Sequence, residues 1–472
     1  MWRRPPLRRA LASLSLLLSL GTGACASERS VDGGATAAPV CPIAAQPASE
    51  AAPAAPRAHA AAPAPLLLKN ARLIDGSGAA PREGVDLALE SGRIKAIGVG
   101  LEAPAGAQVI DLGGRTLLPG LIDAHTHLLS EPAGSYAEGV TRGLAEGEAD
   151  RVLRGADNAW KTLAAGFTTV RNVGGSLADS SLRDAIAAGR VPGPRMLVAN
   201  HSIGITGGHC DHTNNAHPEQ IPAEPDYRDG IADGATAVRL AVRYQVKHGA
   251  DLIKICATGG VLSQGDGVAA PQLTPEEMQA IVDEAVRAGR KVAAHAHGNQ
   301  GIVDAVKAGV HSIEHGSILD PKTVALMKKR GVFLVPTTYV GRYVEEAADQ
   351  GRLSPDSAAK AKAIAPKMRA SFALAYRGGV KIALGSDAGV FPHGDNAREL
   401  AEMVRLGMKP MDAVVAATSG AAELLGLADV GLVIEGMHAD LVAVDGDPLA
   451  DISVVGAPAL VIKGGVVYVQ RW

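Results

Sequence analysis

Aromatic side chains are scarce in this chain, at 3% of its 472 residues, whereas alanine, glycine and valine are abundant. The interior must therefore be built mainly from small aliphatic side chains, as the interiors of parallel α/β proteins can be. An excess of one charge is also absent, because 46 basic and 49 acidic residues leave a formal net charge of −3. This balance gives no reason to expect nucleic acid or an anionic membrane surface as a partner.

Long apolar runs and cysteines are also in short supply. The apolar run near the N-terminus, Leu11 to Leu20, has about ten residues, roughly half of what a membrane-spanning helix requires. We therefore expect no transmembrane span. Four cysteines are too few for a disulfide framework. We expect Cys256 to be a small core residue, and a Cys41–Cys210 bridge is an open alternative.

The N-terminus has the pattern of a secretory signal peptide. A basic segment precedes the apolar run, and Ala24-Cys25-Ala26 fits the small-residue cleavage pattern. We expect residues 1–26 to be this signal and the protein to be exported to the periplasm. Cys25 allows a second outcome, a lipoprotein anchored to the membrane through that cysteine. Against it, the leucine usual three residues earlier is replaced by Thr22.

Composition divides the rest of the chain into three kinds of segment. Residues 27–65 are mostly alanine and proline and are predicted to be a linker. Residues 66–118 and 427–472 have the pattern of short strands separated by glycine and proline turns. Because chain ends commonly lie close together, these two segments are predicted to form one small β-sandwich domain.

Residues 119–426 alternate apolar strands with Ala-rich amphipathic helices, which predicts parallel strands with crossover helices. Helices are expected at 274–288, 300–309, 321–330 and 357–378. Strands are expected at 121–127, 167–171, 195–199, 251–256, 291–297, 311–315, 332–336 and 381–386. Eight strands favour an α/β fold of the (β/α)8 TIM-barrel type. An open doubly wound sheet is the alternative, but no glycine-rich nucleotide-binding motif supports it.

Side chains that bind metals stand at the C-terminal ends of several expected strands, where TIM barrels hold their active sites. His125 and His127 are two residues apart on one strand, so both point to the same side. His295, His315 and Asp387 lie at the ends of three other strands. Imidazole and carboxylate ligands of this kind suit zinc or a similar divalent ion.

Lys254 lies in the apolar strand Leu252-Ile253-Lys254-Ile255-Cys256. A buried ammonium group is costly unless it is paired, so such a lysine tends to lose its proton. The neutral amine can take up carbon dioxide to form a carbamate, whose two oxygens can bridge two metal ions. The alternative is a buried ion pair between Lys254 and Asp387.

In their order and strand context, these motifs resemble those of the amidohydrolase superfamily, in its binuclear branch with a carboxylated lysine. The resemblance covers about residues 66–472. It implies two divalent ions, zinc being the favoured metal, with Lys254 as a bridging N6-carboxylysine. It further implies which residues hold each ion: His125, His127 and Asp387 the more buried one, and His295 and His315 the more exposed one.

The nearest branch resembles Xaa-Pro dipeptidase (prolidase)-like hydrolases, a likeness carried by residues 205–209, 292–298 and 312–316. It implies a metal-dependent enzyme that cleaves a dipeptide or an N-acyl amino acid with a metal-bridged hydroxide. Asp387 would then act as general base and afterwards as general acid. The alternatives are a hydrolase of cyclic amides, imidazolones or lactones, and a non-catalytic barrel that only binds ligands. A homo-oligomer is compatible with the sequence.

Four further residues are candidates for substrate binding. His209 follows Gly207 and Gly208, which allow close approach of a ligand, and we expect it to contact a substrate carboxylate; a loop histidine that caps a turn is the alternative. His297 is expected to face inward, in substrate contact or in core packing. Tyr339 and Arg342 follow the seventh expected strand, where they can line the pocket.

Overall fold

The computed structural model describes residues 63–472 except residues 215 and 222. The predicted signal peptide and nearly all of the predicted linker therefore lie outside the described residues. Within these limits the chain has an α/β fold in which one mixed sheet accompanies two parallel sheets.

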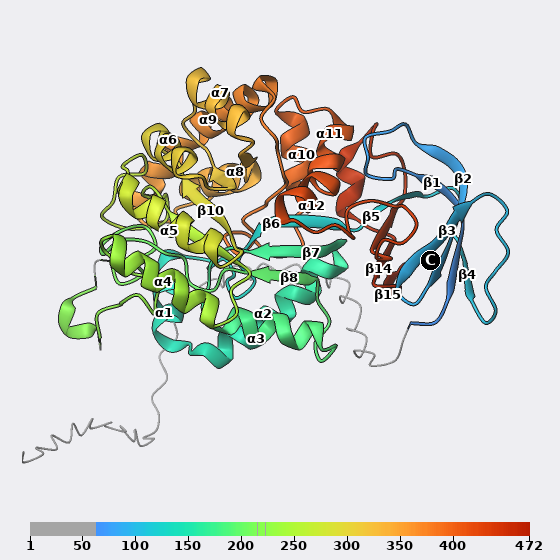
Figure 1. The fold of residues 1–472 in the computed structure, drawn as a ribbon, viewed down its shortest axis with the longest axis horizontal. Helices are drawn as coiled ribbons and strands as arrows, with labels where there is room; N and C mark the ends of the chain where they lie inside the picture. The colour runs from blue at the N-terminus through green and yellow to red at the C-terminus, as the bar shows by residue number, and fades with distance from the viewer. Residues whose placement is uncertain (1–62, 215, 222) are drawn as a thin grey trace, which may run out of the picture. The chain divides into compact units, whose positions relative to one another are not determined.

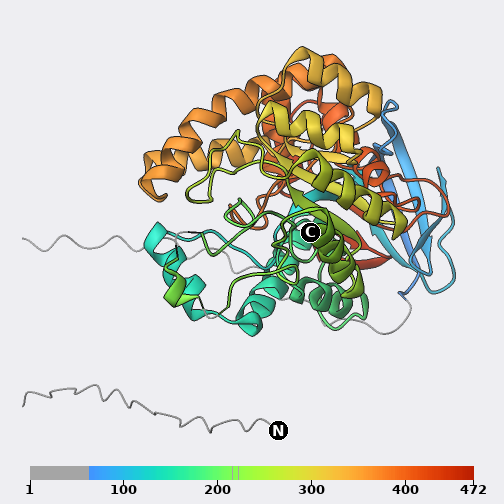
Figure 2. The same cartoon turned by 60° about the vertical axis from the view of Figure 1, so that its left-hand side comes forward.

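The mixed sheet draws its strands from both ends of the described chain. Its order is β15-β14-β13-β5-β1-β2-β3, and β4 also pairs with β1. The central join is antiparallel between β5 and β13, where Leu117 lies opposite Ala443. Figures 1 and 2 show the N-terminal strands in blue and the C-terminal strands in red. The strands are β1 Leu66–Leu73, β2 Arg82–Glu90, β3 Arg93–Gly98, β4 Gln108–Asp111, β5 Thr116–Pro119, β13 Leu441–Val444, β14 Leu460–Lys463 and β15 Val466–Gln470.

The two parallel sheets contain seven of the eight strands expected for the middle of the chain. One has the order β6-β7-β8 and the other the order β12-β11-β10-β9, with every pair parallel. The strands are β6 Leu121–Thr126, β7 Phe167–Asn172, β8 Arg195–Val198, β9 Leu252–Cys256, β10 Lys291–Ala296, β11 Ser312–His315 and β12 Phe333–Val335.

The eighth expected strand, residues 381–386, does not form a regular strand, but its backbone bonds to both sheets. Ile382 bridges Leu334 of β12, and the Ala124 amide of β6 donates to the Leu384 carbonyl at 2.8 Å. Because this segment alternates between two neighbours, it has no continuous ladder with either. The other edges of the two parallel sheets are β8 and β9. They are also joined, because the amide of Asp251, just before β9, donates to the carbonyl of Val198 in β8 at 2.8 Å.

Helices follow most of the parallel strands in sequence, as the expected alternation requires (Figure 1). The four predicted helices are present as α5, α6, α7 and α9, and the Thr274 side chain caps α5 by accepting from the Glu277 amide. The helices are α1 Tyr136–Ala145, α2 Glu148–Ala164, α3 Ala178–Ala187, α4 Ala235–Lys247, α5 Pro275–Arg287, α6 Asn299–Ala308, α7 Pro321–Arg330, α8 Thr338–Asp349, α9 Pro355–Gly378, α10 Arg398–Arg405, α11 Pro410–Ala416 and α12 Ser419–Leu425, with short 3-10 turns at Pro218–Gln220 and Ile452–Gly456.

Small aliphatic side chains fill the interior, as the shortage of aromatics predicts. A large buried cluster packs the outward faces of β9 and β10 against α4, α5 and α6, with Ile253, Val292 and Ile302 fully buried. Alternation along β9 therefore leaves Lys254 on the opposite face of the sheet. Among the described residues, no helix combines the length and apolar character needed to cross a membrane.

Candidate metal centre

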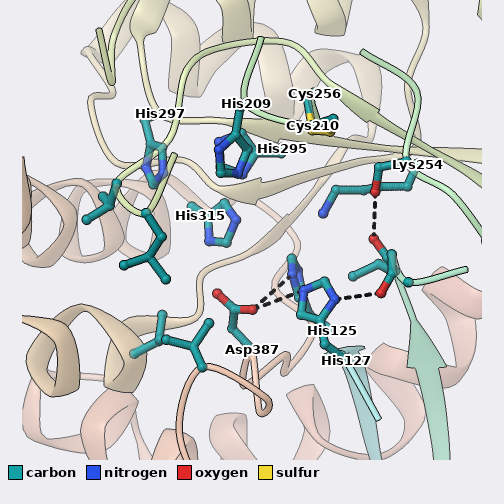
Figure 3. A pocket seen from close by; sticks show the side chains of 18 of the residues that line it. His125, His127, His209, Cys210, Lys254, Cys256, His295, His297, His315 and Asp387 are labelled. Atoms are coloured by element: carbon teal, nitrogen blue, oxygen red, sulfur yellow. Dashed lines mark hydrogen bonds and ion pairs between the residues drawn. A yellow bond between two sulfur atoms is a disulfide. The ribbon is translucent and has the colours of Figure 1, made fainter. Parts of the chain in front are cut away.

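A first cluster consists of His125 in β6, His127 directly after that strand, and Asp387. His127 Nε2 lies 3.2 Å and His125 Nε2 3.5 Å from the same oxygen of Asp387, Oδ1 (Figure 3). Asp387 has a left-handed backbone, with φ of 65°, a conformation that is costly for a residue other than glycine. The surrounding contacts must therefore hold this carboxylate in place.

Asp123 helps to fix the position of Asp387, because its carboxylate joins β6 to the segment around Ser386. One of its oxygens, Oδ1, accepts from the amides of His125 at 3.0 Å and Ser386 at 2.9 Å. Gly385 is required beside them, because a Cβ at this position would lie 2.7 Å from the Cβ of His125. The motifs around residues 125 and 387, far apart in sequence, are thus fastened to each other by a buried carboxylate.

Three histidines from the ends of β10 and β11 form a second cluster. The ligand atoms of His295, His297 and His315 all lie within 4.8 Å of one another, as do those of the first cluster. The ring centroids of His125 and His315 are only 5.0 Å apart, so the two clusters adjoin. His297 therefore belongs to the group of histidines itself, rather than lying in a separate layer of packing.

Each of these rings has one nitrogen engaged by a protein atom, which leaves the other nitrogen for a ligand. In the second cluster, hydrogen bonds join His295 Nε2 to the Gly259 carbonyl at 3.1 Å, His297 Nδ1 to Ser317 Oγ at 2.7 Å, and His315 Nδ1 to Thr337 Oγ1 at 2.8 Å. Burial lowers the pKa of His295 and of His315 well below the ordinary range. Both rings are therefore neutral at pH 7, as metal ligation requires.

His125 and His127 are oriented in the same way. The Nδ1–H of His125 donates to Glu314 at 2.7 Å, and the Nδ1–H of His127 donates to the Gly174 carbonyl at 2.8 Å. Hydrogen bonds of this kind on the remote ring nitrogen are typical of metal-binding histidines. Two adjoining sets of imidazole and carboxylate donors fit zinc or a similar ion, which is the donor chemistry the sequence predicted.

Lys254 is 3% exposed and Figure 3 shows its side chain directed toward the histidines. Burial lowers the pKa of its ammonium group to about 8. No ion pair of Lys254 occurs within the part of the chain that the structure describes, so the alternative of a Lys254–Asp387 pair does not hold in this structure. Although the charges of Glu314 and Asp387 oppose it, this lowered pKa makes the buried amine easier to neutralise and more open to chemical modification.

A buried ion pair behind the centre was not anticipated from the sequence. Glu314 accepts from His125 and, through its other oxygen, from Arg171 Nη2 at 2.8 Å. Although burial opposes it, the charge of Arg171 together with the hydrogen bond from His125 lowers the pKa of Glu314 to about 2. The available signal was one charged residue in each of two buried strands, β7 and β11.

A cavity of about 300 Å³ opens in front of both clusters. His209 lines it and stacks on His295, with ring centroids 4.1 Å apart. His201 and His212, neither of which was among the predicted site residues, also line it. On the other side the wall is apolar and is built from Val261, Leu262, Val340, Val344, Ile364, Met368 and Val390.

Cys256 is buried in the core, as expected, but its bonding was not predicted. It forms a disulfide with Cys210, with Cα atoms 6.1 Å apart. Cys41 lies outside the described residues, but because Cys210 is already paired, the Cys41–Cys210 alternative is wrong. The pairing was hidden because the two cysteines meet only when the loop after β8 folds over β9.

Tyr339 and Arg342 do not line the cavity, since α8 turns other residues toward it. Tyr339 packs edge-on against Phe391, with ring centroids 5.0 Å apart. Arg342 lies on the exposed face and donates to Glu346 at 2.9 Å. Which side chains of α8 face the cavity depends on where the helix begins and how it is rotated. The position of the preceding strand end does not give this information.

Comparison with known proteins shows which family has these motifs. The sequence profile described as "Amidohydrolase family" matches residues 116–467. The chain belongs to the amidohydrolase family. It is 36% identical over 368 residues to an ochratoxinase from Aspergillus niger, covering 75% of this chain and 75% of that one.

Two solved structures extend the likeness. A Xaa-Pro dipeptidase with bound methionine in its active site has a TM-score of 0.82 and 38% identity, over 86% of this chain and 100% of the other. A prolidase complexed with N-methylphosphonate-L-proline has a TM-score of 0.77 and 33% identity, again over 86% and 100%. The predicted resemblance is confirmed: this amidohydrolase is of the prolidase and ochratoxinase type, and hydrolyses amide bonds.

Proposed function

We propose that this amidohydrolase holds two divalent ions and removes the C-terminal residue from a dipeptide or an N-acyl amino acid. The observation that carries the proposal is that two adjoining clusters of possible metal ligands and a buried lysine line one cavity. His125, His127 and Asp387 would hold one ion, and His295 and His315, with His297 beside them, the other. Zinc suits these donors, and Lys254 as N6-carboxylysine would join the two halves.

When bound, the ions would supply a Lewis acid for the substrate carbonyl and lower the pKa of a water molecule. The chain's own contribution is to move the proton. Although burial opposes it, the nearby His125 and His127 lower the pKa of Asp387, so this carboxylate is ionised at neutral pH. Its Oδ1 faces the two imidazoles, which leaves Oδ2 to accept a proton from water and return it to the leaving amine.

The apolar residues that line the cavity favour a substrate with an apolar side chain. Val340, Val344, Ile364 and Met368 come from α8 and α9 and line the same cavity as the ligand clusters. Burial of a side chain of leucine or phenylalanine size is worth roughly 1.5–3 kcal/mol. We therefore expect a preference for apolar residues. The dipeptidase with bound methionine and the prolidase complexed with a proline derivative, both similar to this chain, point the same way.

The proposed scaffold is a (β/α)8 barrel beside a small β-sandwich domain. The backbone bonds of residues 381–388 to both β12 and β6, together with the bond between β8 and β9, support a closed ring. The proposed domain limits are residues 119–426 for the barrel and residues 66–118 with 427–472 for the β-domain.

We also propose that the protein is exported, with Cys25 lipidation as the second outcome. The Cys210–Cys256 disulfide supports an oxidising compartment. Mass spectrometry of the N-terminal peptide from membrane and soluble fractions would test this. An intact residue 1 in mature protein would contradict export, and a lipid mass on Cys25 would support the anchor.

The enzymatic proposal is tested by supplying zinc and bicarbonate and then comparing matched substrates. We expect hydrolysis of dipeptides and N-acyl amino acids with an apolar C-terminal residue, and two ions per chain by elemental analysis. Cyclic amides and lactones form the second arm. Preferred cleavage of the cyclic compounds, or protein with no bound metal at full activity, would overturn the proposal.

A further inference from the structure

A second cavity, of about 390 Å³, adjoins the cavity in front of the two ligand clusters. The two cavities have part of their wall in common, because Leu262, Val344 and Val390 line both of them. Leu262 is 43% exposed, so this common wall reaches the surface and is not sealed inside the core. These three side chains stand between the ligand clusters and the second cavity.

Apolar and aromatic side chains make up most of the lining of the second cavity. Pro132, Tyr136 and Val140 come from α1 and the segment before it, and Tyr343 and Leu353 come from α8 and the segment after it. No residue of α1 is buried, and Tyr136 and Val140 are 51% and 46% exposed. Burial of this surface against an apolar ligand would be favourable.

The charged side chains that line the second cavity, Glu131 and Arg352, already have partners in the protein. Glu131 Oε1 lies 3.3 Å from Arg142 Nη1. Arg352 donates to the Tyr343 hydroxyl at 3.0 Å and to Gln350 Oε1 at 2.9 Å, and its guanidinium lies 4.9 Å from the centre of the Tyr343 ring. A charged ligand group would have to displace one of these contacts, whereas an uncharged apolar group would not. The cavity therefore favours an apolar ligand.

We propose that the second cavity is a subsite for the acyl group of the substrate, and that this group is an extended apolar chain. The inference rests on the proposed function, which places the C-terminal residue against apolar side chains of the first cavity. The part of the substrate on the other side of the scissile amide then extends past Val344 and Val390 into the second cavity. The substrate is thereby narrowed to an N-acyl amino acid, because the ammonium group of a dipeptide would meet no unpaired carboxylate among the described residues that line this cavity.

Gly139 in α1 offers a way to fill the second cavity alone. It belongs to the lining of the second cavity and not to that of the first, and a Cβ at this position would lie 3.5 Å from the Cβ of Ala133, an ordinary contact. Because leucine also forms helices more readily than glycine, Gly139→Leu should fold. Gly143 lies in the same helix but is exposed, and a Cβ there would meet no described atom within 4 Å. Gly143→Leu is therefore the matched control.

The subsite is tested by kinetics of the metal-loaded proteins with N-acyl leucines whose acyl group lengthens from acetyl through hexanoyl to decanoyl. Burial of one methylene group corresponds to a gain in affinity of up to about fourfold, so we expect the wild-type KM to fall at least about tenfold from the acetyl to the decanoyl compound. The ratio of the two KM values is taken within each protein. We expect Gly139→Leu to lose most of this gain and Gly143→Leu to keep it.

Binding of the same compounds to Asp387→Asn, measured by isothermal titration calorimetry, separates the subsite from turnover. We expect the decanoyl compound to bind more tightly than the acetyl compound, and Gly139→Leu in the same protein to remove most of the difference. Equal affinity for the two compounds, or a difference that Gly139→Leu leaves intact, would overturn the subsite.

Failure of the subsite and failure of the proposed function are distinguishable. If N-acetyl leucine is cleaved but a longer acyl group brings no gain, the subsite is wrong and the proposed function stands. If the decanoyl compound binds more tightly through the second cavity but no amide is cleaved, the binding site stands and the proposed function fails. Faster cleavage of dipeptides than of decanoyl amino acids with the same C-terminal residue would overturn the restriction to N-acyl substrates.

Discussion

Glu314 accepts a hydrogen bond from Nδ1 of His125 at 2.7 Å, while its second oxygen accepts from Arg171. All three side chains are buried. The carboxylate therefore fixes the ring of His125 with Nε2 directed at Asp387, and the arginine keeps that carboxylate ionised. The positions of the candidate metal-binding atoms therefore depend on residues that would not themselves touch a metal.

Replacing Glu314 with Gln should weaken zinc binding without unfolding the protein. The amide can still bond to His125 but no longer polarises its ring, and loss of such a partner typically reduces metal affinity 10–100-fold. Competition with a chelating dye would measure this. Glu346→Gln is the control, since Glu346 pairs with Arg342 on the surface. Equal zinc affinity in all three proteins would contradict the role of Glu314.

Asp387→Asn should keep the fold and at least one bound ion but lose turnover. The amide cannot accept the proton of water, and a positioned general base contributes about 10²–10⁴-fold to rate. Measurement of kcat together with metal content separates chemistry from binding. Turnover near that of the wild type would remove Asp387 from proton transfer.

Lys254→Ala should lose most activity and recover part of it when short carboxylic acids such as formate or acetate are added. The reason is that a small carboxylate can occupy the space of the missing carbamate. Lys362→Ala, at an exposed lysine, should behave as the wild type in both conditions. If metal content and rate survive in Lys254→Ala, the carbamate proposal is wrong.

Removal of the Cys210–Cys256 disulfide should destabilise the protein. The bond joins residues 46 apart in sequence, and a loop of that size corresponds to about 2–4 kcal/mol in the free energy of unfolding. The double variant Cys210→Ser/Cys256→Ser is compared with the wild type in urea, with and without reductant. Reductant should lower the midpoint of the wild type alone. Free-thiol titration that finds both cysteines reactive in native protein would argue against the bond.

Metal removal should also lower stability. A ligand that binds only the folded state contributes about 2.7 kcal/mol when present at 100 times its Kd, so chelation should lower Tm and added zinc should restore it. Differential scanning calorimetry with chelator and then with excess zinc measures the shift. A Tm that does not respond to either would argue against bound metal in the folded protein.

Much of this site was predictable because its signals are local. His125 and His127 are two residues apart in the sequence. The apolar residues on either side of Lys254 and His295 predict that both side chains are buried. The partners of these residues were not predictable in the same way. Glu314 meets His125 across 189 positions of sequence and Ser386 meets Asp123 across 263, and no local pattern encodes such distances.

By itself the sequence determined the ligand types, their places at strand ends and the amidohydrolase family, because hydrophobic alternation and motif order are properties of neighbouring residues. Only the tertiary structure decided that Cys210 pairs with Cys256, that Tyr339 and Arg342 face away from the cavity, that His297 joins the second cluster, and which nitrogen of each ring is free. Those features depend on the distance and angle between side chains brought together from different segments, and these are set by packing.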